Sequence, residues 1–555
     1  MKAKHAAILC VIVLLSAQSA FAQKAYSDEY ISKLDGKKRP YVVCASDRSD
    51  TPKPLIIDVS PAGTYVNHAK QTMAMIVGMA SKSGEQCVAL RPTGRGDGSI
   101  YMNYGERDLF EAIEDVCKKH AIDRDRIYLY GHSMGGAATW YLASHYPDFF
   151  AAAAPSAGYC DYRLWKKPGG WTFHLNEWEE PNWISRSACY LTENLEHTPV
   201  YIIHGEWDRG TGGGVDVRHA RQMRDLMTEA GFPPKYLEVP EKGHGFGERF
   251  AEITEGKIRW FFEQKKERDP KHVSHVAYEL RHNKAYWVSI DQFIKYGATG
   301  AKVDATRKSK NEMVVLTENV RTFSLGPIDG YKAKVVIDGQ RLGKANLTKK
   351  RSFRIDEDGK WVLGEYDLSR EKRRGSAGGI DDLFFEDLLI VNGTIGTAEE
   401  DFFNQKAARN IPWYYKQHNG GVHRGGIKGY NHVDIPVVSD VALTEQQRTS
   451  KNLLVIGTYK TNAILAKFAD RLPLKFGEGW LEICGRRFEG RDVTAVAIFP
   501  HPENPDRYVA VHGGVTPDAI SWGSHLHLGL LPDYIVYSQA EVIDWGFWGN
   551  DWREQ

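Results

Sequence analysis

The chain has 555 residues, which is too long for a single hydrophobic core and predicts two to four domains. Its 72 basic and 71 acidic side chains leave a net charge of +1, so electrostatics gives no reason to expect a nucleic-acid or anionic-membrane partner. A hydrophobic content of 42% is ordinary for a folded protein and excludes a largely disordered chain.

The first residues, MKAKHAAILCVIVLLSAQSAFAQK, have the features of a secretory signal peptide. A basic start precedes an apolar run from Ala6 to Ala17, and the small residues Ala20 and Ala22 predict cleavage after Ala22. The run is short for a bilayer span. We therefore expect export to the periplasm or the medium, with no membrane span after cleavage.

Six of the seven cysteines follow the predicted cleavage site. Export permits disulfides but does not demand them in a chain of this size. Cys160 and Cys189 bracket one aromatic-rich segment, and two interpretations stay open: a disulfide bridge, or two buried thiols.

Residues from about 40 to 265 alternate short apolar runs with helical patterns. The runs, each bounded by Pro, Gly or Asp, lie at 41–44, 55–59, 87–90, 127–130, 151–155 and 200–204. Between two of them, Leu109, Ile113 and Val116 fall on one face of a helix. Alternating strands and helices predict a mostly parallel sheet covered on both faces.

The pattern changes near Lys265, at a charged linker that holds a proline. Strand-like runs follow up to about residue 370 and predict a small antiparallel β domain. The run REKRRGSAGG, which starts at Arg370, is interpreted as an exposed loop with a solvated charged face. Strand and strand–turn–helix patterns after it predict a third, α/β module.

One short stretch carries a motif for nucleophilic catalysis. The apolar run 127–130 passes directly into Gly131-His132-Ser133-Met134-Gly135, and a helical pattern follows. Gly-x-Ser-x-Gly between a strand and a helix is the nucleophile elbow, where larger flanking side chains would collide with neighbouring backbone. The pattern makes Ser133 the candidate nucleophile.

A serine nucleophile needs a base, and the base needs an orienting acid. In this arrangement the partners follow the serine in the order acid, then histidine. Asp208 comes just after the run 200–204, and His244 lies between two glycines after the strand-like KYLEV. Glu206 and Asp216 are alternative acids. The competing interpretation is a turn-capping aspartate and a surface histidine.

The oxyanion hole of such a site needs two backbone N–H groups. We expect one from Met134, the residue after the nucleophile. The second is expected in the loop after run 55–59, from Ala62 or Gly63, since Pro61 has no N–H.

The stretches DRIYLYGHSMGGAATWYLASHYPDFFAAAAPSAG, YIIHGEWD and EKGHGF resemble secreted α/β-hydrolase esterases of the polyhydroxybutyrate-depolymerase and feruloyl/acetyl-xylan-esterase type. They are also similar to the catalytic domains of prolyl-oligopeptidase-like proteins. The resemblance covers less than half of the chain and implies the triad Ser133, Asp208 and His244. Two stretches depart from the pattern: Ser60-Pro61 replaces the usual His-Gly, and a glycine-rich run follows Arg209.

We therefore expect an α/β-hydrolase fold, followed by a small β-rich domain and a C-terminal α/β module. The expected boundaries are a signal peptide at 1–22, the catalytic domain at 23–267, the β-rich domain at 268–375 and the C-terminal module at 376–555. No cofactor and no metal are expected. His525 and His527 would share one face of a strand, but no further ligand stands at a fixed spacing from them.

The segment between runs 151–155 and 200–204 contains four tryptophans: Trp165, Trp171, Trp178 and Trp183. They form either a wall that binds an acylated carbohydrate, or packing that holds this segment onto the body. The predicted function is a secreted serine carboxylic-ester hydrolase working through an acyl-enzyme, with acyl groups on polysaccharide as the candidate substrate. The alternatives are a serine peptidase of the prolyl-oligopeptidase type and a non-catalytic binding protein. The peptidase is less favoured, because the short segment before the first strand leaves no room for the usual β-propeller.

Overall fold

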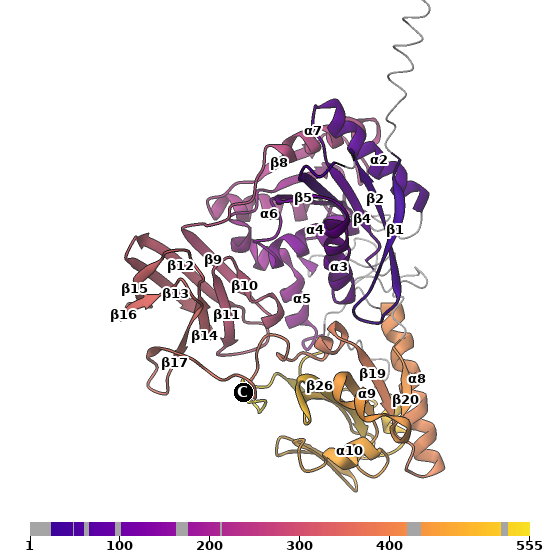
Figure 1. The fold of residues 1–555 in the computed structure, drawn as a ribbon. Helices are drawn as coiled ribbons and strands as arrows, with labels where there is room; N and C mark the ends of the chain where they lie inside the picture. Colours follow the sequence, from indigo (N-terminus) through magenta and orange to yellow (C-terminus); the bar gives the residue numbers. More distant parts are fainter. Residues whose placement is uncertain are drawn as a thin grey trace, which may run out of the picture.

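The computed structural model describes residues 24–47, 49–59, 66–94, 101–162, 176–210, 214–418, 435–522 and 531–555. The predicted signal peptide lies outside these residues. Three sheet-based bodies follow one another along the chain, with the first at the top and the other two below it (Figure 1). No helix in the described part of the chain is long and apolar enough to cross a membrane.

The first body is built on an eight-stranded sheet. Its strands lie in the order β1 (Tyr26–Ile31), β2 (Lys38–Ala45), β4 (Val88–Pro92), β3 (Lys53–Asp58), β5 (Ile122–His132), β6 (Ala152–Ser156), β7 (Tyr201–Gly205) and β8 (Lys235–Val239). Strands β3 to β8 pair in parallel, whereas β1 and β2 pair antiparallel. Strands β3, β4, β6 and β7 are buried along their whole length, so they read as continuous apolar runs. Strand β1 was not predicted from the sequence.

Helices cover both faces of this sheet. Helices α2 (Val66–Lys82) and α7 (Phe250–Phe262) pack on the face that carries Ile56. Helices α3 (Tyr104–Lys119) and α4 (Met134–His145) pack on the opposite face, against Leu55 and Ile57. Because successive strand residues point to opposite faces, Leu55, Ile56 and Ile57 divide between the two cores.

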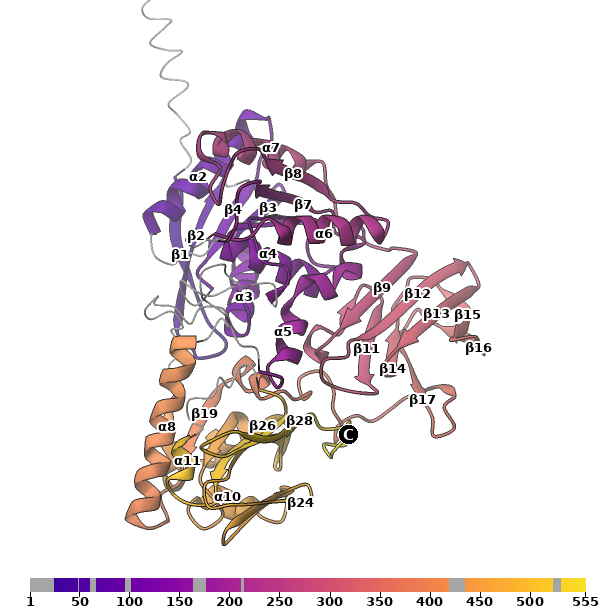
Figure 2. The same cartoon turned by 180° about the vertical axis from the view of Figure 1, so that it is seen from behind.

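The second body is a sandwich of two five-stranded sheets (Figure 2). One sheet holds β10 (Lys284–Ala285), β11 (Val288–Phe293), β14 (Val320–Leu325), β17 (Arg351–Ile355) and β18 (Trp361–Gly364). The other holds β16 (Gln340–Asn346), β15 (Lys332–Ile337), β13 (Glu312–Glu318), β12 (Ala301–Ser309) and β9 (His272–Ala277). Their inward side chains form one core around Phe323 and Phe353.

The third body has a seven-stranded mixed sheet. Its strands lie in the order β20 (Val437–Ser439), β19 (Leu388–Asn392), β21 (Asn452–Ile456), β26 (Asn504–Gly514), β25 (Thr494–His501), β27 (Tyr534–Tyr537) and β28 (Val542–Gly546). Helices α8 (Ala398–His418), α9 (Glu445–Ser450), α10 (Ala463–Phe468) and α11 (Ala519–Trp522) accompany it. A small antiparallel sheet adds β22 (Leu474–Gly477), β23 (Trp480–Ile483) and β24 (Arg486–Glu489).

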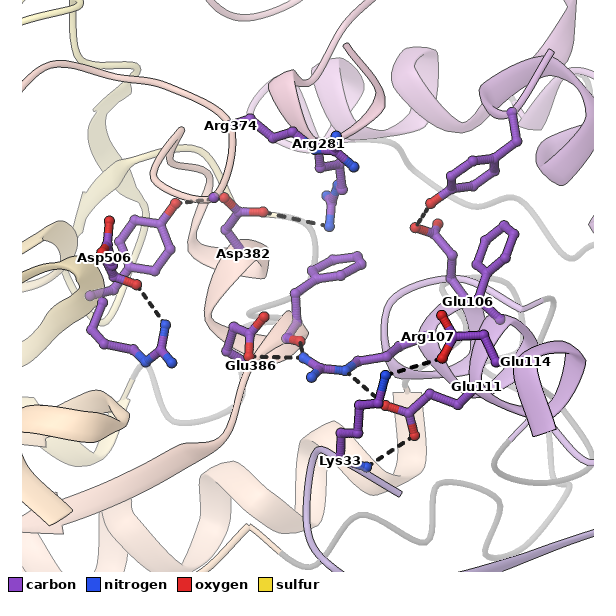
Figure 3. Close-up of a pocket in the computed structure, with 16 residues that line it drawn as sticks. Lys33, Glu106, Arg107, Glu111, Glu114, Arg281, Arg374, Asp382, Glu386 and Asp506 are labelled. Carbon is purple, nitrogen blue, oxygen red and sulfur yellow. Dashed lines mark hydrogen bonds and ion pairs between the residues drawn. The ribbon is translucent and has the colours of Figure 1, made fainter. Parts of the chain in front are cut away.

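A charged cavity of about 500 Å³ lies where the three bodies meet. Figure 3 shows Arg107 of α3 directed toward Glu386, and Arg281 of the sandwich directed toward Asp382. The short 3-10 helix η6 (Ile380–Phe385) supplies Asp381, whose Oδ2 lies 2.6 Å from Arg281. Buried charges are stable when they are paired and hydrogen-bonded, so this network fixes how the bodies meet.

The charged run that starts at Arg370 belongs to the same junction. The structure contradicts the prediction of a solvated loop, because Lys372 is fully buried and forms an ion pair with Asp533. Arg373 pairs with Asp506 across to β26. Lys372 and Arg373 thus bind partners in the third body, and Glu371 pairs with Arg354 of the sandwich. Arg370 and Arg374 are exposed.

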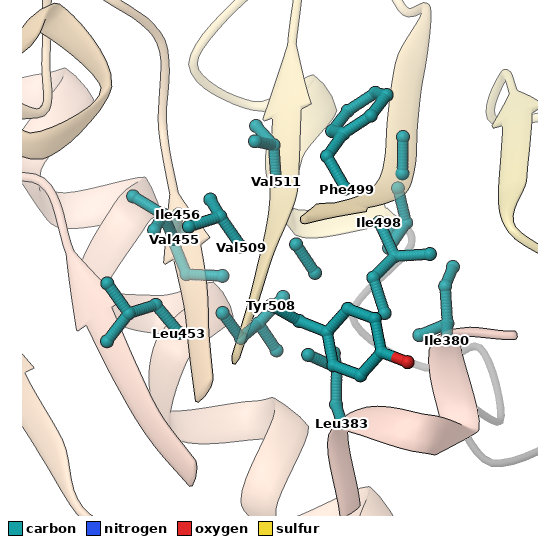
Figure 4. Close-up of a cluster of buried hydrophobic side chains, with 14 of the residues drawn as sticks. Ile380, Leu383, Leu453, Val455, Ile456, Ile498, Phe499, Tyr508, Val509 and Val511 are labelled. Carbon is teal, nitrogen blue, oxygen red and sulfur yellow. The ribbon is translucent and has the colours of Figure 1, made fainter. Parts of the chain in front are cut away.

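The apolar side of the junction is continuous with the core of the third body. Figure 4 shows Ile380 and Leu383 of η6 directed toward Ile498 and Tyr508 of the sheet. The same buried cluster extends to Tyr104 of α3 in the first body. Separating the third body from the first would therefore expose apolar surface as well as paired charges.

His272 links the first body to the sandwich through two carboxylates. Its Nδ1 lies 2.9 Å from Glu196 and its Nε2 lies 3.1 Å from Asp304. The hydrogen bonds with Asp304 and Glu196 raise the pKa of His272 from 6.5 to about 10. The folded protein therefore holds this proton more tightly than the unfolded chain, and the stabilisation is complete below pH 6.5 and lost as the pH rises through 10.

We expect His272→Gln to lower the thermal unfolding midpoint at about pH 6 and to have little effect above about pH 10.5, where the imidazole has lost its charge. Differential scanning calorimetry of both proteins at the two pH values checks this. An equal difference between them at both pH values would contradict a charged His272.

Candidate active site

Ser133 lies in the tight turn between β5 and α4. Its backbone has φ 60° and ψ −118°, a strained conformation for a residue with a side chain. A Cβ added to Gly131 would lie 2.4 Å from the carbonyl oxygen of Gly135, and one added to Gly136 would lie 2.3 Å from that of Ser156. Both are closer than Cβ atoms approach, so the turn excludes larger residues at these two positions.

Gly131→Ala is expected to lower stability by about 1–3 kcal/mol, since the clash is with backbone that cannot rotate away. It should also displace Oγ of Ser133 and lower kcat/KM about 100-fold or more. Gly78→Ala in α2 is the matched control, because a Cβ there meets nothing within 4 Å, and alanine should add about 0.5–1 kcal/mol to stability. Unfolding midpoints and ester kinetics of the two variants check this. A Gly131→Ala protein as stable and active as the wild type would refute the steric argument.

The side chains of Ser133, His244 and Asp208 form one hydrogen-bonded line. His244 Nε2 lies 2.8 Å from Ser133 Oγ, and His244 Nδ1 lies 2.6 Å from Asp208 Oδ2. The imidazole can donate its Nδ1–H to the carboxylate while Nε2 accepts from the serine hydroxyl. The residues come from the end of β5, the loop after β7 and the loop after β8, all at one edge of the sheet.

Asp208 is held as a carboxylate by two histidines. It is 2% exposed, and His204 Nε2 lies 3.3 Å from the same oxygen that contacts His244. Burial alone would raise the pKa of Asp208, but the hydrogen bonds with His204 and His244 outweigh burial and hold that pKa far below its ordinary range. His204 was not predicted as a site residue, although its position near the end of β7, four residues before Asp208, could have indicated it.

The alternative acids have other partners. Glu206 accepts a hydrogen bond from the backbone N–H of Glu241 at 2.9 Å. Asp216 pairs with Arg218, whose Nη2 lies 2.9 Å from it. Of the three carboxylates considered, Asp208 is the one in contact with His244.

His132, the variable residue of the elbow, also lies beside the line. Its ring centroid is 4.9 Å from that of His244, and its Nδ1 is 3.2 Å from Ser156 Oγ. Burial lowers the pKa of His132 to about 3, so this ring is neutral at physiological pH. It gives His244 a packing surface without adding charge.

The predicted oxyanion donors are only partly described. Met134 is the first residue of α4, and N–H groups of a first helical turn have no carbonyl partner within their helix. Ala62 and Gly63 lie outside the described residues.

The four tryptophans of the connecting segment have different surroundings. Trp165 and Trp171 lie outside the described residues. Trp183 is 5% exposed and packs on Tyr162 with ring centroids 5.5 Å apart, as the packing interpretation predicts. Trp178 is half-buried against the core of the third body.

Cys160 and Cys189 do not form a disulfide bond in this structure, which contradicts the bridge interpretation. The thiol of Cys160 instead donates to the carbonyl of His219 at 3.2 Å. Burial raises the pKa of this thiol well above its ordinary value, so it acts as a small buried side chain.

Within the described ranges, no three His, Cys, Asp or Glu side chains are grouped as a metal site. His525 and His527 lie outside those ranges.

Comparison with known proteins gives a family match for part of the chain. The prolyl oligopeptidase family model matches residues 99–267. An uncharacterized secreted protein of Arthroderma benhamiae is 31% identical over 298 residues, covering 48% of this chain and 30% of that protein. Poly(3-hydroxyalkanoate) depolymerase C of Paucimonas lemoignei is 39% identical over 62 residues, covering 11% of this chain and 15% of that protein. The chain thus spans less than a third of the length of either relative.

Among solved structures, an acylaminoacyl peptidase of Pyrococcus horikoshii superposes with a TM-score of 0.37 and 16% identity, covering 46% of this chain and 43% of that one. The expected fold class, an α/β-hydrolase fold followed by β-rich and α/β regions, is confirmed. The family match supports a serine hydrolase but does not distinguish the expected esterase type from a peptidase. Residues 99–267, which carry the elbow and the histidine loop, are similar to the prolyl oligopeptidase family of serine hydrolases.

Proposed function

We propose that this protein is an exported serine hydrolase that cleaves carboxylic esters through an acyl-enzyme. The observation that carries the proposal is the hydrogen-bonded line from Ser133 through His244 to Asp208, on a strained strand–helix turn. A serine, an imidazole and a buried carboxylate in this order make the serine hydroxyl nucleophilic. The word secreted in the name of the Arthroderma relative and the signal-like first residues support export.

Each residue has a definite part in the proposed reaction. Ser133 Oγ attacks the ester carbonyl while His244 Nε2 takes its proton, and Asp208 stabilises the imidazolium. Backbone N–H groups, with Met134 as one donor and Ala62 or Gly63 as the other, stabilise the oxyanion. His244 then protonates the leaving alcohol, and water releases the acyl group by the same steps.

The ester assignment rests on the stretch shared with a poly(3-hydroxyalkanoate) depolymerase, whose name describes a polyester substrate. Acyl groups on polysaccharide are the proposed natural substrate, because aromatic faces stack on sugars and the packing observed for Trp183 leaves the sugar-binding interpretation open for Trp165 and Trp171. Cleavage of peptide bonds is the second candidate, favoured by the prolyl oligopeptidase match.

The test is hydrolysis by the chain from Gln23 onward of acetyl and feruloyl esters of xylo-oligosaccharides, beside aminoacyl anilides. Cleavage of the esters alone supports the proposal. Cleavage of the anilides alone would identify the protein as a peptidase and contradict the proposal. Loss of either activity in Ser133→Ala ties it to this site.

A further inference from the structure

A second feature of the first body lies beside Ser133. A cavity of about 580 Å³ opens between α2 and α7, at the edge of the sheet where β3 to β7 end. One wall is apolar and consists of Met75, Ile203, Phe246, Phe250 and Ile253. Phe250 is 50% exposed, so the apolar surface continues to the solvent. The volume is in the range of pockets that bind small organic ligands.

A buried ammonium group lines the same cavity. Lys257 of α7 is 7% exposed, and its Nζ lies 3.5 Å from the centroid of the Tyr130 ring. Over the part of the chain that the structure describes, Nζ has no hydrogen bond or ion pair. Burial lowers the pKa of Lys257 to about 8, so the group is still mostly protonated at pH 7.

The charge of Asp58 favours the Lys257 ammonium but does not outweigh the effect of burial. Asp58 is 1% exposed and accepts from Arg91 Nε at 3.0 Å, so these two form a closed ion pair. His132 is neutral, since burial lowers its pKa to about 3. The cavity therefore carries one net positive charge on Lys257. A buried ammonium group without a hydrogen bond or ion pair is costly, and an anionic ligand would lower that cost.

We propose that this cavity binds an apolar part of the substrate that ends in a carboxylate, and that the Lys257 ammonium receives this carboxylate. The ligand class is a short aliphatic or aromatic group with a terminal carboxylate, attached to the ester on its acyl side or on its alcohol side. The proposal rests on the proposed function for the ester, but binding of the carboxylate requires no hydrolysis. The two can therefore be tested separately.

The binding test uses the Ser133→Ala protein and isothermal titration calorimetry with monomethyl glutarate, an anion, and dimethyl glutarate, its neutral counterpart. The anion should bind about 10- to 100-fold more tightly, as expected for a charge-assisted hydrogen bond. Lys257→Met should remove this preference, and Lys257→Arg should keep most of it. Arg259→Met is the matched control, since Arg259 is an exposed cation of the same helix that pairs with Glu255.

Equal affinity for the two probes, no detectable binding of the anion, or an anion preference that survives Lys257→Met would overturn the proposal. Far-ultraviolet circular dichroism of each variant separates these results from unfolding.

The kinetic test identifies the side of the ester that carries the carboxylate. The acyl-side pair is the mono-p-nitrophenyl ester of glutarate against p-nitrophenyl pentanoate, and the alcohol-side pair is 4-acetoxybenzoate against phenyl acetate. One pair should show a 10- to 100-fold preference in kcat/KM for the charged substrate, and Lys257→Met should abolish this preference. Hydrolysis without any charge preference would overturn this inference but would still support the proposed esterase function. Failure to cleave all four substrates would count against the esterase, and the binding test would still decide the role of Lys257.

Discussion

Ser133→Ala is expected to lower kcat/KM for the preferred ester by about 10⁴-fold or more, because no other group in the line can form the acyl-enzyme. The fold should be preserved. The backbone N–H of Ser133 bonds the carbonyl of Ser156 at 2.9 Å, and this contact does not involve the side chain. Steady-state kinetics and the thermal unfolding midpoint of the variant measure both effects.

Ser156→Ala is the control for that experiment. Ser156 lies in the same cavity, but its hydroxyl contacts His132 rather than His244, so its loss should cost less than about 10-fold. Wild-type activity in Ser133→Ala, or equal losses in both variants, would mean that Ser133 is not the nucleophile.

Asp208→Asn is expected to lower kcat about 10³- to 10⁴-fold with little change in KM. An asparagine cannot stabilise the imidazolium, and its amide can donate to Nδ1 of His244, which leaves Nε2 protonated and unable to accept from Ser133. The variant also leaves His204 beside a neutral amide, so a small loss of stability is expected. Separate measurement of kcat and KM distinguishes this effect from weaker substrate binding.

Glu206→Gln is the matched control, since Glu206 bonds the backbone of Glu241 and lies outside the line. It should leave kcat unchanged within about threefold. A loss in Glu206→Gln comparable to that in Asp208→Asn would mean that the acid has been misassigned.

The elbow could be predicted from the sequence because its cause is local. Gly131 and Gly136 are required by contacts with Gly135 and Ser156, and the four residues 127–130 directly before the turn are a buried apolar run. Asp208 and His244 follow successive parallel strands, and parallel strands end at the same edge of a sheet. Three side chains far apart in the chain were therefore expected together, and the structure brings them into contact.

Other features could not be predicted in this way. Strand β1 alternates between half-buried and exposed residues over most of its length, so it lacks the apolar run that marks the central strands. Lys372 reads as part of a charged loop, yet it pairs with Asp533, 161 residues later. Arg281 and Asp381 are 100 residues apart and belong to different bodies. Ion pairs of this kind depend on how the bodies pack, so no local sequence pattern predicts them.

The surroundings of the side chains near the site also could not be predicted from local sequence patterns. Trp183 is apolar and aromatic whether it binds a sugar or fills the core, and only its 5% exposure distinguishes the two. Lys257 reads as an ordinary helical lysine, since its burial follows from the packing of α7 on the sheet.

The most direct test of the central claim is to treat the protein with a fluorophosphonate and locate the adduct by peptide mass spectrometry. Ser133 as the nucleophile predicts one adduct on the peptide that contains Ser133, lost in Ser133→Ala and strongly slowed in Asp208→Asn. An adduct on another residue, or labelling that persists in Ser133→Ala, would contradict the assignment of Ser133 as the nucleophile.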